Sequence, residues 1–428
     1  MTPSRIDPPA SLAQAIAELP AYNPAALPVA DACALIARTL APVQAVERLP
    51  IRDCLGRVLA HDIDSPIDVP AHDNSAMDGY ALRHADLAAD APTRLRVIGA
   101  AYAGKPFAQA VAAGEAVRIM TGAVMPAGAD TVVPQESLRA EGDAILVPSG
   151  QQVGQNRRLA GEDLARGRAA LRAGRILGAA DLGLIASLGI AEAPVRRRLR
   201  VACLSTGDEI ASLGEALGPG QVYDSNRYTL HGMLTRLGAQ VIDLGVVRDD
   251  PALLEAAITQ AADCADAVIS SGGVSVGEAD FTRDIMARLG EVAFWTIAMR
   301  PGRPLAFGQI GNARYFGLPG NPVAVMITFL FFARPALLRL MGASAADPMP
   351  VLARVEERLR KRPGRTEYQR AQVRVAADGE LVVRTTGSQG SGVLRSMSEA
   401  NAIMVLGHEQ GDVQPGDRVS CLLFEGLL

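Results

Sequence analysis

The chain has 428 residues, of which 49% are hydrophobic and 21% charged, so it is long enough for two to four domains with real cores. A net charge of −4 argues against a general nucleic-acid binder, and 4% aromatic residues leave little for base stacking. Five scattered cysteines without zinc-ligand spacing indicate reduced thiols. Because there is no signal-peptide pattern and no uninterrupted apolar run of ~20 residues, we expect a cytoplasmic protein outside the membrane.

The first part of the chain predicts an extension, a linker and a β-rich domain. Residues 1–25 contain several prolines and no continuous apolar run, so we expect a flexible N-terminal extension. Residues 26–69 and 164–197 have mixed helical and extended character, and they predict one discontinuous, elongated linker domain. Residues 70–163 carry short β-like runs separated by Gly, Pro and Asp turn signals, which predict a β-rich domain.

The second half is easier to interpret. Residues 198–345 alternate strand and helix patterns, with Asp250 as a helix N-cap followed by Pro251 at the first helical position. This alternation predicts a doubly wound, mostly parallel sheet with helices on both faces. Residues 346–428 are all-β, including a hairpin pattern over 366–387, and predict a small C-terminal barrel or sandwich. The fold class is therefore a multidomain α/β protein around an αβα domain.

Five unusual polar stretches each follow a predicted strand of the αβα domain. In a doubly wound sheet, ligands bind at the carboxyl ends of the strands. One such loop would mean little, but five predict a site at one edge of the sheet. The stretches are STGDE (205–209), RDDP (248–251), SSGGVSVGEAD (270–280), RPGRP (300–304) and PGNP (319–322).

The residue types in these loops suit a phosphate ester. Consecutive glycines, Gly272 and Gly273, let backbone amides approach an anion closely. Asn321 is a plausible N-cap before a long helix, whose first amides would face the same anion. Arg300 and Arg303 lie on a proline-stiffened turn and suit a multiply charged anion. We therefore expect phosphate-like groups to bind here.

The same loops carry acids. Glu209, Asp249 and Asp280 supply hard oxygen ligands, which suit Mg²⁺ rather than a softer metal. Anion donors beside carboxylates predict a phosphate ester bound together with a divalent cation. The alternative for any single loop is a tight turn without a ligand, and Asp250 fits a helix cap better than a metal ligand. Walker-type nucleotide hydrolysis is disfavoured because no G-K-[ST] follows the glycines, and a dinucleotide-binding fingerprint is absent.

A second polar cluster lies in the β-rich domain. Residues 69–82 read VPAHDNSAMDGYAL, and residues 118–136 read RIMTGAVMPAGADTVVPQE. Polar residues this dense between short strands are either turn chemistry or a binding surface. Composition alone leaves both alternatives open.

Taken together, these stretches resemble the MoeA family, the molybdopterin molybdenumtransferases, which includes the E domain of gephyrin. The resemblance runs in family order from about residue 30 to the C-terminus. The matching motifs are DNSAMDGYA, RIMTGAVMPAGADTVVPQE, GQNRRLAGED, STGDE, YDSNR, VRDDP, SSGGVSVGEAD, RPGRP and GLPGNPV.

The resemblance implies a function and an assembly. Family members take adenylylated molybdopterin and molybdate, insert the metal at the dithiolene and release AMP, with Mg²⁺ assisting. They are homodimers with four domains per subunit, one of them MogA-like, and the linker domain serves dimerisation. The active cleft lies between the αβα domain of one subunit and the β-rich domain of the other. Contacts with molybdopterin adenylyltransferase and with molybdoenzyme chaperones are further implied partners.

The resemblance also implies roles for individual residues. Its catalytic positions are Asp78, Asp163, Glu209, Asp249 and Asp280. Asp249 and Asp280 are the implied metal ligands. The expected substrate-binding positions are Thr121, Ser205, Thr206, Ser271, Gly272, Gly273, Ser275, Arg300, Arg303, Pro319, Gly320, Asn321, Pro322, Arg370 and Ser391.

One departure from the family pattern concerns a basic loop. The family often has lysines in KPGKP, where this chain has Arg300 and Arg303, and a further family lysine is Thr296 here. Arginine keeps the charge and adds a fork of donors, so anion binding should survive, whereas a role that needs a lysine amine would not. Adenylylation of molybdopterin by ATP and a non-catalytic, gephyrin-like scaffold are the alternative functions. No residue distinguishes molybdate from tungstate.

Overall fold

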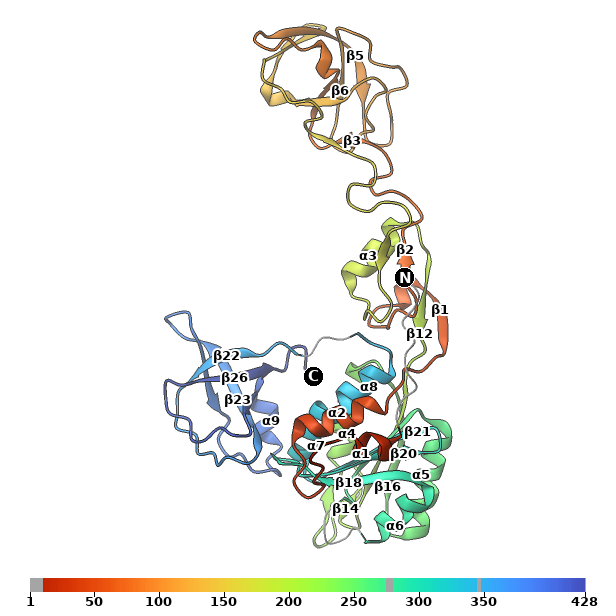
Figure 1. Ribbon diagram of the computed structural model, residues 1–428, viewed down its shortest axis with the longest axis vertical. Coiled ribbons are helices and arrows are strands. Elements are labelled where there is room, and N and C mark those ends of the chain that lie inside the picture. The colour runs from red at the N-terminus through yellow and green to blue at the C-terminus, as the bar shows by residue number, and fades with distance from the viewer. Residues whose placement is uncertain (1–10, 275–279, 345–347, 428) are drawn as a thin grey trace.

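The computed structural model describes residues 11–274, 280–344 and 348–427, without the side chains of residues 280 and 281. The molecule is elongated (Figure 1). A β-rich unit lies at one end, a narrow linker joins it to the remainder, and an αβα layer and a small barrel form the broad end. Three of these parts have hydrophobic clusters of their own, and the largest cluster lies beneath the central sheet.

The central sheet has the order β16-β13-β17-β21-β20-β18. Its first four strands are parallel, and the last two pair antiparallel at one edge. The chain passes from β13 to β16 on one side and then to β17 on the other, so the strand order reverses beside β13, where doubly wound sheets bind ligands. The strands are β13 (Arg200–Thr206), β16 (Gln240–Val247), β17 (Ala267–Ser271), β18 (Gly290–Thr296), β20 (Pro304–Ile310) and β21 (Ala313–Leu318).

Helices cover both faces of this sheet. The predicted start of α5 is confirmed, since the Asp250 side chain accepts a hydrogen bond from the Leu253 amide and Pro251 is the first helical residue. A short parallel pair, β14 (Ile210–Ala211) and β15 (Val222–Tyr223), precedes α4. The helices are α4 (Asn226–Arg236), α5 (Pro251–Cys264), α6 (Asp280–Leu289), α7 (Pro322–Thr328) and α8 (Arg334–Leu340).

A π-helical turn, η4 (Phe329–Ala333), joins α7 to α8, so residues Pro322–Leu340 form one continuous helix. Pro335 has no N–H for the Phe331 carbonyl, and that carbonyl instead accepts the thiol of Cys33 at 3.4 Å. The helix is long and apolar enough to cross a membrane by length and composition, but 78% of its most apolar window is buried inside the protein. It is therefore a core helix of the αβα layer.

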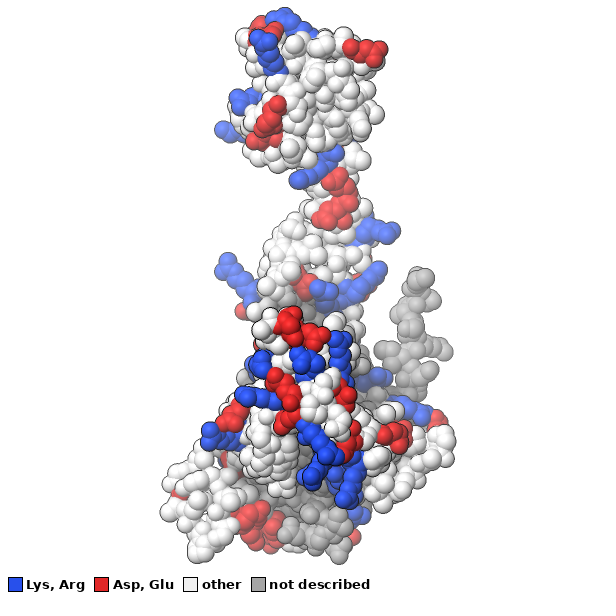
Figure 2. All heavy atoms as spheres, turned by 90° about the vertical axis from the view of Figure 1, so that its left-hand side faces the viewer, with Lys and Arg blue, Asp and Glu red and all other residues white. Residues whose placement is uncertain are grey.

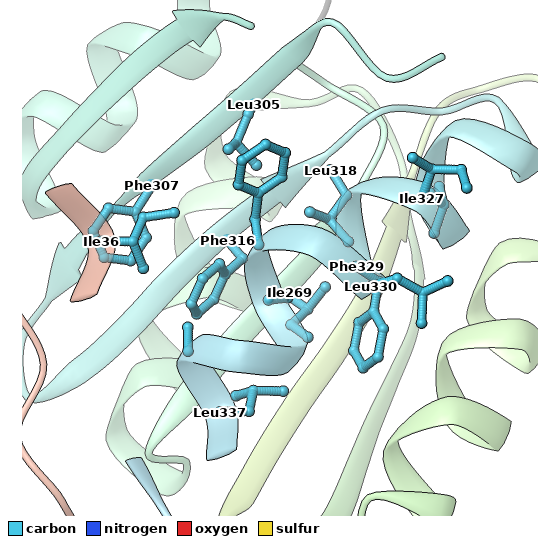
Figure 3. Packing of buried hydrophobic residues seen from close by; sticks show 14 of the residues in the cluster. Ile36, Ile269, Leu305, Phe307, Phe316, Leu318, Ile327, Phe329, Leu330 and Leu337 are labelled. Carbon is cyan, nitrogen blue, oxygen red and sulfur yellow. The ribbon is translucent and has the colours of Figure 1, made fainter. Parts of the chain in front are cut away.

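This helix packs on the sheet across an apolar interface (Figure 3). Ile269 and Phe316 from the sheet meet Phe329 and Leu337 from the helix, and all four are buried. Ile36 of α2 (Val29–Arg38), a helix from the N-terminal part of the chain, belongs to the same buried cluster. The near-continuous apolar strands are what a sheet covered on both faces requires.

The N-terminal segment differs from the predicted flexible extension. Residues Leu12–Ala17 form α1, and Ser11 and Gln14 make a capping box at its start. Leu12 is buried in the main core, and the Trp295 indole donates to the Tyr22 hydroxyl at 3.0 Å. This helix is hard to predict because it is short and prolines flank it on both sides.

The C-terminal region forms a closed five-stranded barrel, as predicted. Strand β23 pairs with both β24 and β25, and the order β23-β24-β22-β26-β25 returns to β23. The β23–β24 hairpin is the one that the sequence predicts. Acids and bases are interspersed over the side of the molecule that carries the barrel (Figure 2). The elements are β22 (Val351–Val355), β23 (Thr366–Val375), β24 (Leu381–Thr385), α9 (Arg395–Glu399), β25 (Ala402–Leu406) and β26 (Arg418–Leu423).

The far end of the molecule is a unit that we call the β unit, residues 70–163. Its sheet has the order β7-β4-β6-β5-β9-β8. Three single-turn 3₁₀ helices accompany the linker and this unit: η1 (Ile51–Asp53), η2 (His84–Asp86) and η3 (Gln135–Ser137). The strands are β3 (Asn74–Ser75), β4 (Gly79–Leu82), β5 (Thr93–Ala101), β6 (Glu115–Ile119), β7 (Thr131–Pro134), β8 (Arg139–Glu141), β9 (Ala144–Val147) and β10 (Arg157–Arg158).

The linker consists of two antiparallel chain segments, one entering the β unit and one leaving it. β1 (Val46–Pro50) pairs with β12 (Glu192–Arg196), and β2 (Ile63–Asp64) pairs with β11 (Ala169–Leu171). Helix α3 (Ala179–Ser187) packs beside them in a separate hydrophobic cluster. The β unit is therefore held by a two-stranded tether.

Candidate functional site

A cleft of about 980 Å³ lies at the carboxyl ends of the central strands. Loops after β13, β16, β17 and β21 form it, together with the RPGRP turn and residues 389–394 of the barrel region. The strand order thus brings the five predicted loops to one place. The predicted site residues that line it are Ser205, Thr206, Glu209, Asp249, Ser271, Gly272, Gly273, Arg300, Arg303, Pro319, Gly320, Asn321, Pro322 and Ser391.

The glycine turn after β17 is closely packed. Gly272 has φ +96° and Gly273 φ +67°, both in the region that side chains rarely adopt. A Cβ on Gly272 would lie 2.5 Å from the carbonyl oxygen of Thr206, so only glycine fits between the ends of β13 and β17. The Gly272 amide donates to the Leu318 carbonyl at 3.1 Å, which ties the turn to β21. The turn is held by three neighbouring strands.

The helix that starts at Pro322 contributes its N-terminal end to the cleft. Asn321 occupies the N-cap position as predicted, but its side chain makes no capping hydrogen bond. The amides of the first turn carry the positive end of a 19-residue helix dipole. This end suits an oxyanion.

An acid–base network that the site predictions did not include supports one wall of the cleft. The buried carboxylate of Asp224 accepts hydrogen bonds from the Ser205 hydroxyl at 3.1 Å and from Arg227 Nε at 3.0 Å. Arg227 also binds both carboxylate oxygens of Asp243. Burial disfavours the Arg227 charge, but the bonds to Asp243 and Asp224 outweigh it and raise the pKa of Arg227. The Ser205 hydroxyl is thereby fixed at the strand end.

The cations of the cleft are Arg300 and Arg303. Arg370 lies behind them, lining an adjacent cavity of about 250 Å³ together with Arg300, and its side chain is only 1% exposed. Burial, and then the charge of Arg300, lower the pKa of Arg370 to about 10. Its guanidinium donates to the carbonyls of Ser388, Gln389 and Gly390 at 2.9–3.2 Å. Arg370 therefore shapes the loop that lines the cleft rather than the cleft itself.

Two acids of the cleft could hold a metal. Glu209 is exposed at its edge, and Asp249 lines it beside the end of β16. Asp280 is the first residue of α6, but its side chain lies outside the described residues, as does all of Ser275. No group of three or more His, Cys, Asp or Glu among the described residues forms a metal cage. The donor set fits Mg²⁺, which needs one or two carboxylates when substrate oxygens complete its shell.

The remaining predicted residues lie on the β unit and its neck. Asp78 Oδ1 accepts hydrogen bonds from the amide and the hydroxyl of Thr121, both at 2.7 Å. These two bonds, the amide first, lower the pKa of Asp78. Asp163 is exposed where the chain leaves the unit, and its amide donates to the Val69 carbonyl. Within one chain, the β unit lies at the opposite end of the molecule from the αβα layer that holds the cleft (Figure 1).

Comparison with family descriptions covers most of the chain. Residues 27–189 match "MoeA N-terminal region (domain I and II)", and residues 202–339 match "Probable molybdopterin binding domain". Residues 353–424 match "MoeA C-terminal region (domain IV)". The three matches follow one another in the order expected of a single protein family.

Relatives and solved structures agree with this. A molybdopterin molybdenumtransferase of Haemophilus influenzae is 42% identical over 384 residues, 89% of this chain and 95% of that protein. One from a Nostoc species is 38% identical over 359 residues, 82% of each chain. The crystal structure of a molybdopterin biosynthesis moeA protein from Pyrococcus horikoshii superimposes with a TM-score of 0.82 at 29% identity, over 93% of this chain and all of that one. The chain belongs to the MoeA family.

Proposed function

We propose that this protein is a molybdopterin molybdenumtransferase: it inserts molybdenum from molybdate into adenylylated molybdopterin, releases AMP and so forms the molybdenum cofactor. The observation that carries the proposal is the convergence of a glycine turn, two arginines and two carboxylates in one cleft. The name of the Haemophilus relative, which this chain matches over 95% of its length, supports the same activity.

The cleft suits substrates that are oxyanions. Adenylylated molybdopterin carries a phosphoanhydride, and molybdate is itself an oxyanion. The Gly273 amide and the positive end of the long helix dipole favour such groups, and Arg300 and Arg303 neutralise them. The same contacts stabilise the charge that develops on AMP as the phosphoanhydride bond breaks. Binding and leaving-group stabilisation thus use the same groups.

Magnesium is part of the proposal. Asp249, with Glu209 close to the same edge and Asp280 from the start of α6, would hold it against phosphate oxygens of the substrate. The ion, when bound, offsets the negative charge of those oxygens. The protein's own groups orient the phosphoanhydride, while the Ser205 and Ser271 hydroxyls, which donate to Asp224 and to the Pro319 carbonyl, hold the strand ends that shape the cleft.

The separation of the β unit, which carries Asp78 and Thr121, from the αβα layer supports a homodimer (Figure 1). We propose that the β unit of one subunit faces the cleft of the other, which would bring Asp78 to the substrate. A cytoplasmic location, with contacts to molybdopterin adenylyltransferase and to molybdoenzyme chaperones, belongs to the same proposal, because both substrate and product would pass between proteins.

The activity is tested by supplying adenylylated molybdopterin, molybdate and Mg²⁺ and measuring AMP. Release of AMP that depends on molybdate supports the proposal. Product formation from molybdopterin and ATP would instead identify an adenylyltransferase. No turnover with either substrate pair would favour a non-catalytic scaffold. The gain of cofactor activity in a strain lacking the insertase is an independent measure.

The shared site is tested by mixing two inactive variants. Asp78→Asn leaves the cleft intact, and Asp249→Asn leaves the β unit intact. A mixed dimer would then contain one complete site, so refolding the variants together should restore AMP release that neither shows alone. If each site lies within one chain, or if the protein is monomeric, mixing restores nothing.

A further inference from the structure

Asn226, the first residue of α4, joins two loops of the cleft. Its side-chain Nδ2 donates to the Ser271 hydroxyl at 2.9 Å and to the Gly320 carbonyl at 2.6 Å. Ser271 ends β17 immediately before the glycine turn, and Gly320 lies in the turn before the long helix. One amide therefore holds together the two backbone turns that the proposed function assigns to oxyanions.

The orientation of this amide is fixed by its partners. A carbonyl oxygen only accepts hydrogen bonds, so the NH₂ group of Asn226, rather than its oxygen, must face Gly320. The Oδ1 atom is then left buried, with no hydrogen-bond partner among the described residues, and the whole residue is 8% exposed. A buried acceptor without a partner destabilises the folded state.

A second unpartnered group lies close by. The hydroxyl of Thr206 is buried without a hydrogen-bond partner in the described part of the chain, and it is 3.0 Å from where a Cβ of Gly273 would lie. Unsatisfied buried groups are few in folded proteins, and each calls for an explanation. Thr282 Oγ1 is likewise buried without a partner in the described part of the chain, 3.8 Å from the same Cβ position, so two threonine hydroxyls beside the glycine turn join Asn226 Oδ1 in lacking partners.

Helix stability does not explain Asn226. The preceding residue, Ser225, occupies the N-cap position without a capping hydrogen bond, and Asn226 directs its amide away from its own helix toward Ser271 and Gly320. Asparagine is also a weak helix former. The side chain therefore serves the loops rather than α4.

We propose that Asn226 is a positioning residue for the reaction, a role that rests on the proposed function. Its amide sets the spacing between the end of β17 and the turn at residues 319–321. Both turns then present their backbone to the same part of the substrate without rearranging when it binds. Because Asn226 directs its Nδ2 donors at the two turns, its Oδ1 atom is left without a partner among the described residues.

Two variants at this position test the proposal. Asn226→Ala removes the hydrogen bonds that hold the two turns together. Asn226→Asp keeps the shape of the side chain but turns a carboxylate toward the Gly320 carbonyl. We expect kcat/KM for AMP release to fall by ~10²-fold in the first, the size of effect that a small misplacement produces, and at least as far in the second. Hydrogen exchange should rise at the Gly272 amide, which donates to the Leu318 carbonyl at 3.1 Å, while Tm stays near that of the parent protein.

Asn401 supplies the matched control. Its amide is bonded at both ends, donating to the Val373 carbonyl and accepting from the Val373 amide, each at 2.8 Å, in the barrel. Asn401→Ala should lower Tm and leave kcat/KM unchanged, the reverse of Asn226→Ala. The proposal is overturned if Asn226→Ala retains kcat/KM within twofold of the parent, or if its Tm falls as far as that of Asn401→Ala.

Failure of the proposed function would look different. In that case the parent protein itself releases no AMP, and hydrogen exchange alone tests the role of Asn226. Increased exchange at the Gly272 amide in Asn226→Ala, with that of the barrel unchanged, would still establish that Asn226 holds the two turns together. Unchanged exchange there would overturn it.

Discussion

Two glycine-containing loops with predicted roles contrast sharply in their surroundings. Gly272, in the cleft, and Gly122, beside Thr121 in the β unit, both have positive φ, +96° and +78°. A Cβ on Gly272 would meet the Thr206 carbonyl at 2.5 Å, whereas one on Gly122 would meet nothing within 4 Å. The glycine turn of the cleft is therefore packed tightly against its own chain. The Thr121 loop presents an open surface, as a group that completes a site on another subunit would.

Near the cleft, substitution of Arg370 should have the largest effect on stability and activity. Arg370→Met removes the buried donor that the carbonyls of residues 388–390 share, together with its bond to the buried Ser396 hydroxyl. We expect a loss of about 3–5 kcal/mol in the free energy of unfolding, measured with denaturant, and loss of AMP release.

The control for Arg370 is Arg395→Ala. Arg395 is exposed and forms an ion pair with Glu399 within α9, which is worth about 0.5 kcal/mol or less. Equal destabilisation by the two variants would contradict the role assigned to Arg370 in holding the loop at residues 388–390.

Substituting alanine for Gly272 and for Gly122 compares the two loops directly. Gly272→Ala adds a steric clash with the Thr206 carbonyl to the strain of positive φ, so we expect a loss of about 2–4 kcal/mol. Gly122→Ala adds only the strain, about 1–2 kcal/mol. Thermal unfolding of the two variants measures the difference, and a Gly122→Ala variant as unstable as Gly272→Ala would show that the β-unit loop is packed after all.

Arg300 tests the anion side of the cleft without affecting its packing, because its side chain is exposed. Arg300→Ala should raise KM by roughly tenfold or more, the loss expected from one charge-assisted hydrogen bond. Arg300→Lys restores the charge without the fork of donors and should recover part of the affinity. A KM unaffected by Arg300→Ala would remove this residue from the site.

The smallest expected effect is the pH dependence of the contact between Asp78 and Thr121 in the β unit. Two donors from Thr121 lower the pKa of Asp78 below its unfolded value of about 3.9. The contact therefore contributes fully above that pH and is lost as the pH falls through the folded pKa. We expect NMR signals of the Thr121 amide to stay constant near neutral pH and to shift only below about pH 4. Thr121→Val should move that transition to higher pH.

The sequence predicted the cleft because topology leaves few choices. Once strands and helices alternate, the carboxyl ends of parallel strands meet at one edge, so the loops holding Asp249, Gly272 and Asn321 had to converge. The helix start at Asp250 and Pro251 was equally legible, since cap and proline act locally. Predictions of helix starts depend on neighbouring residues only.

Other features depend on contacts between distant segments and were missed. Arg370 lies in a strand with alternating polar residues and so reads as a surface or substrate-binding arginine, whereas it supports a loop nearly 20 residues further along. Asp224 and Asn226 were visible in the YDSNR motif, but their partners Ser205 and Gly320 are remote in sequence. Helix α1 is short and gains its stability from burial of Leu12 rather than from propensity.

The two-stranded tether also constrains the order in which the chain can fold. β1 emerges from the ribosome at Val46, but its partner β12 is complete only at Arg196, after the entire β unit. The β unit has its own cores and can form while β1 waits. Once formed, it holds Val69 next to Leu164, and the remaining loop to be closed is short. The β unit therefore forms first and brings the two linker segments together, so that β1 and β12 can pair.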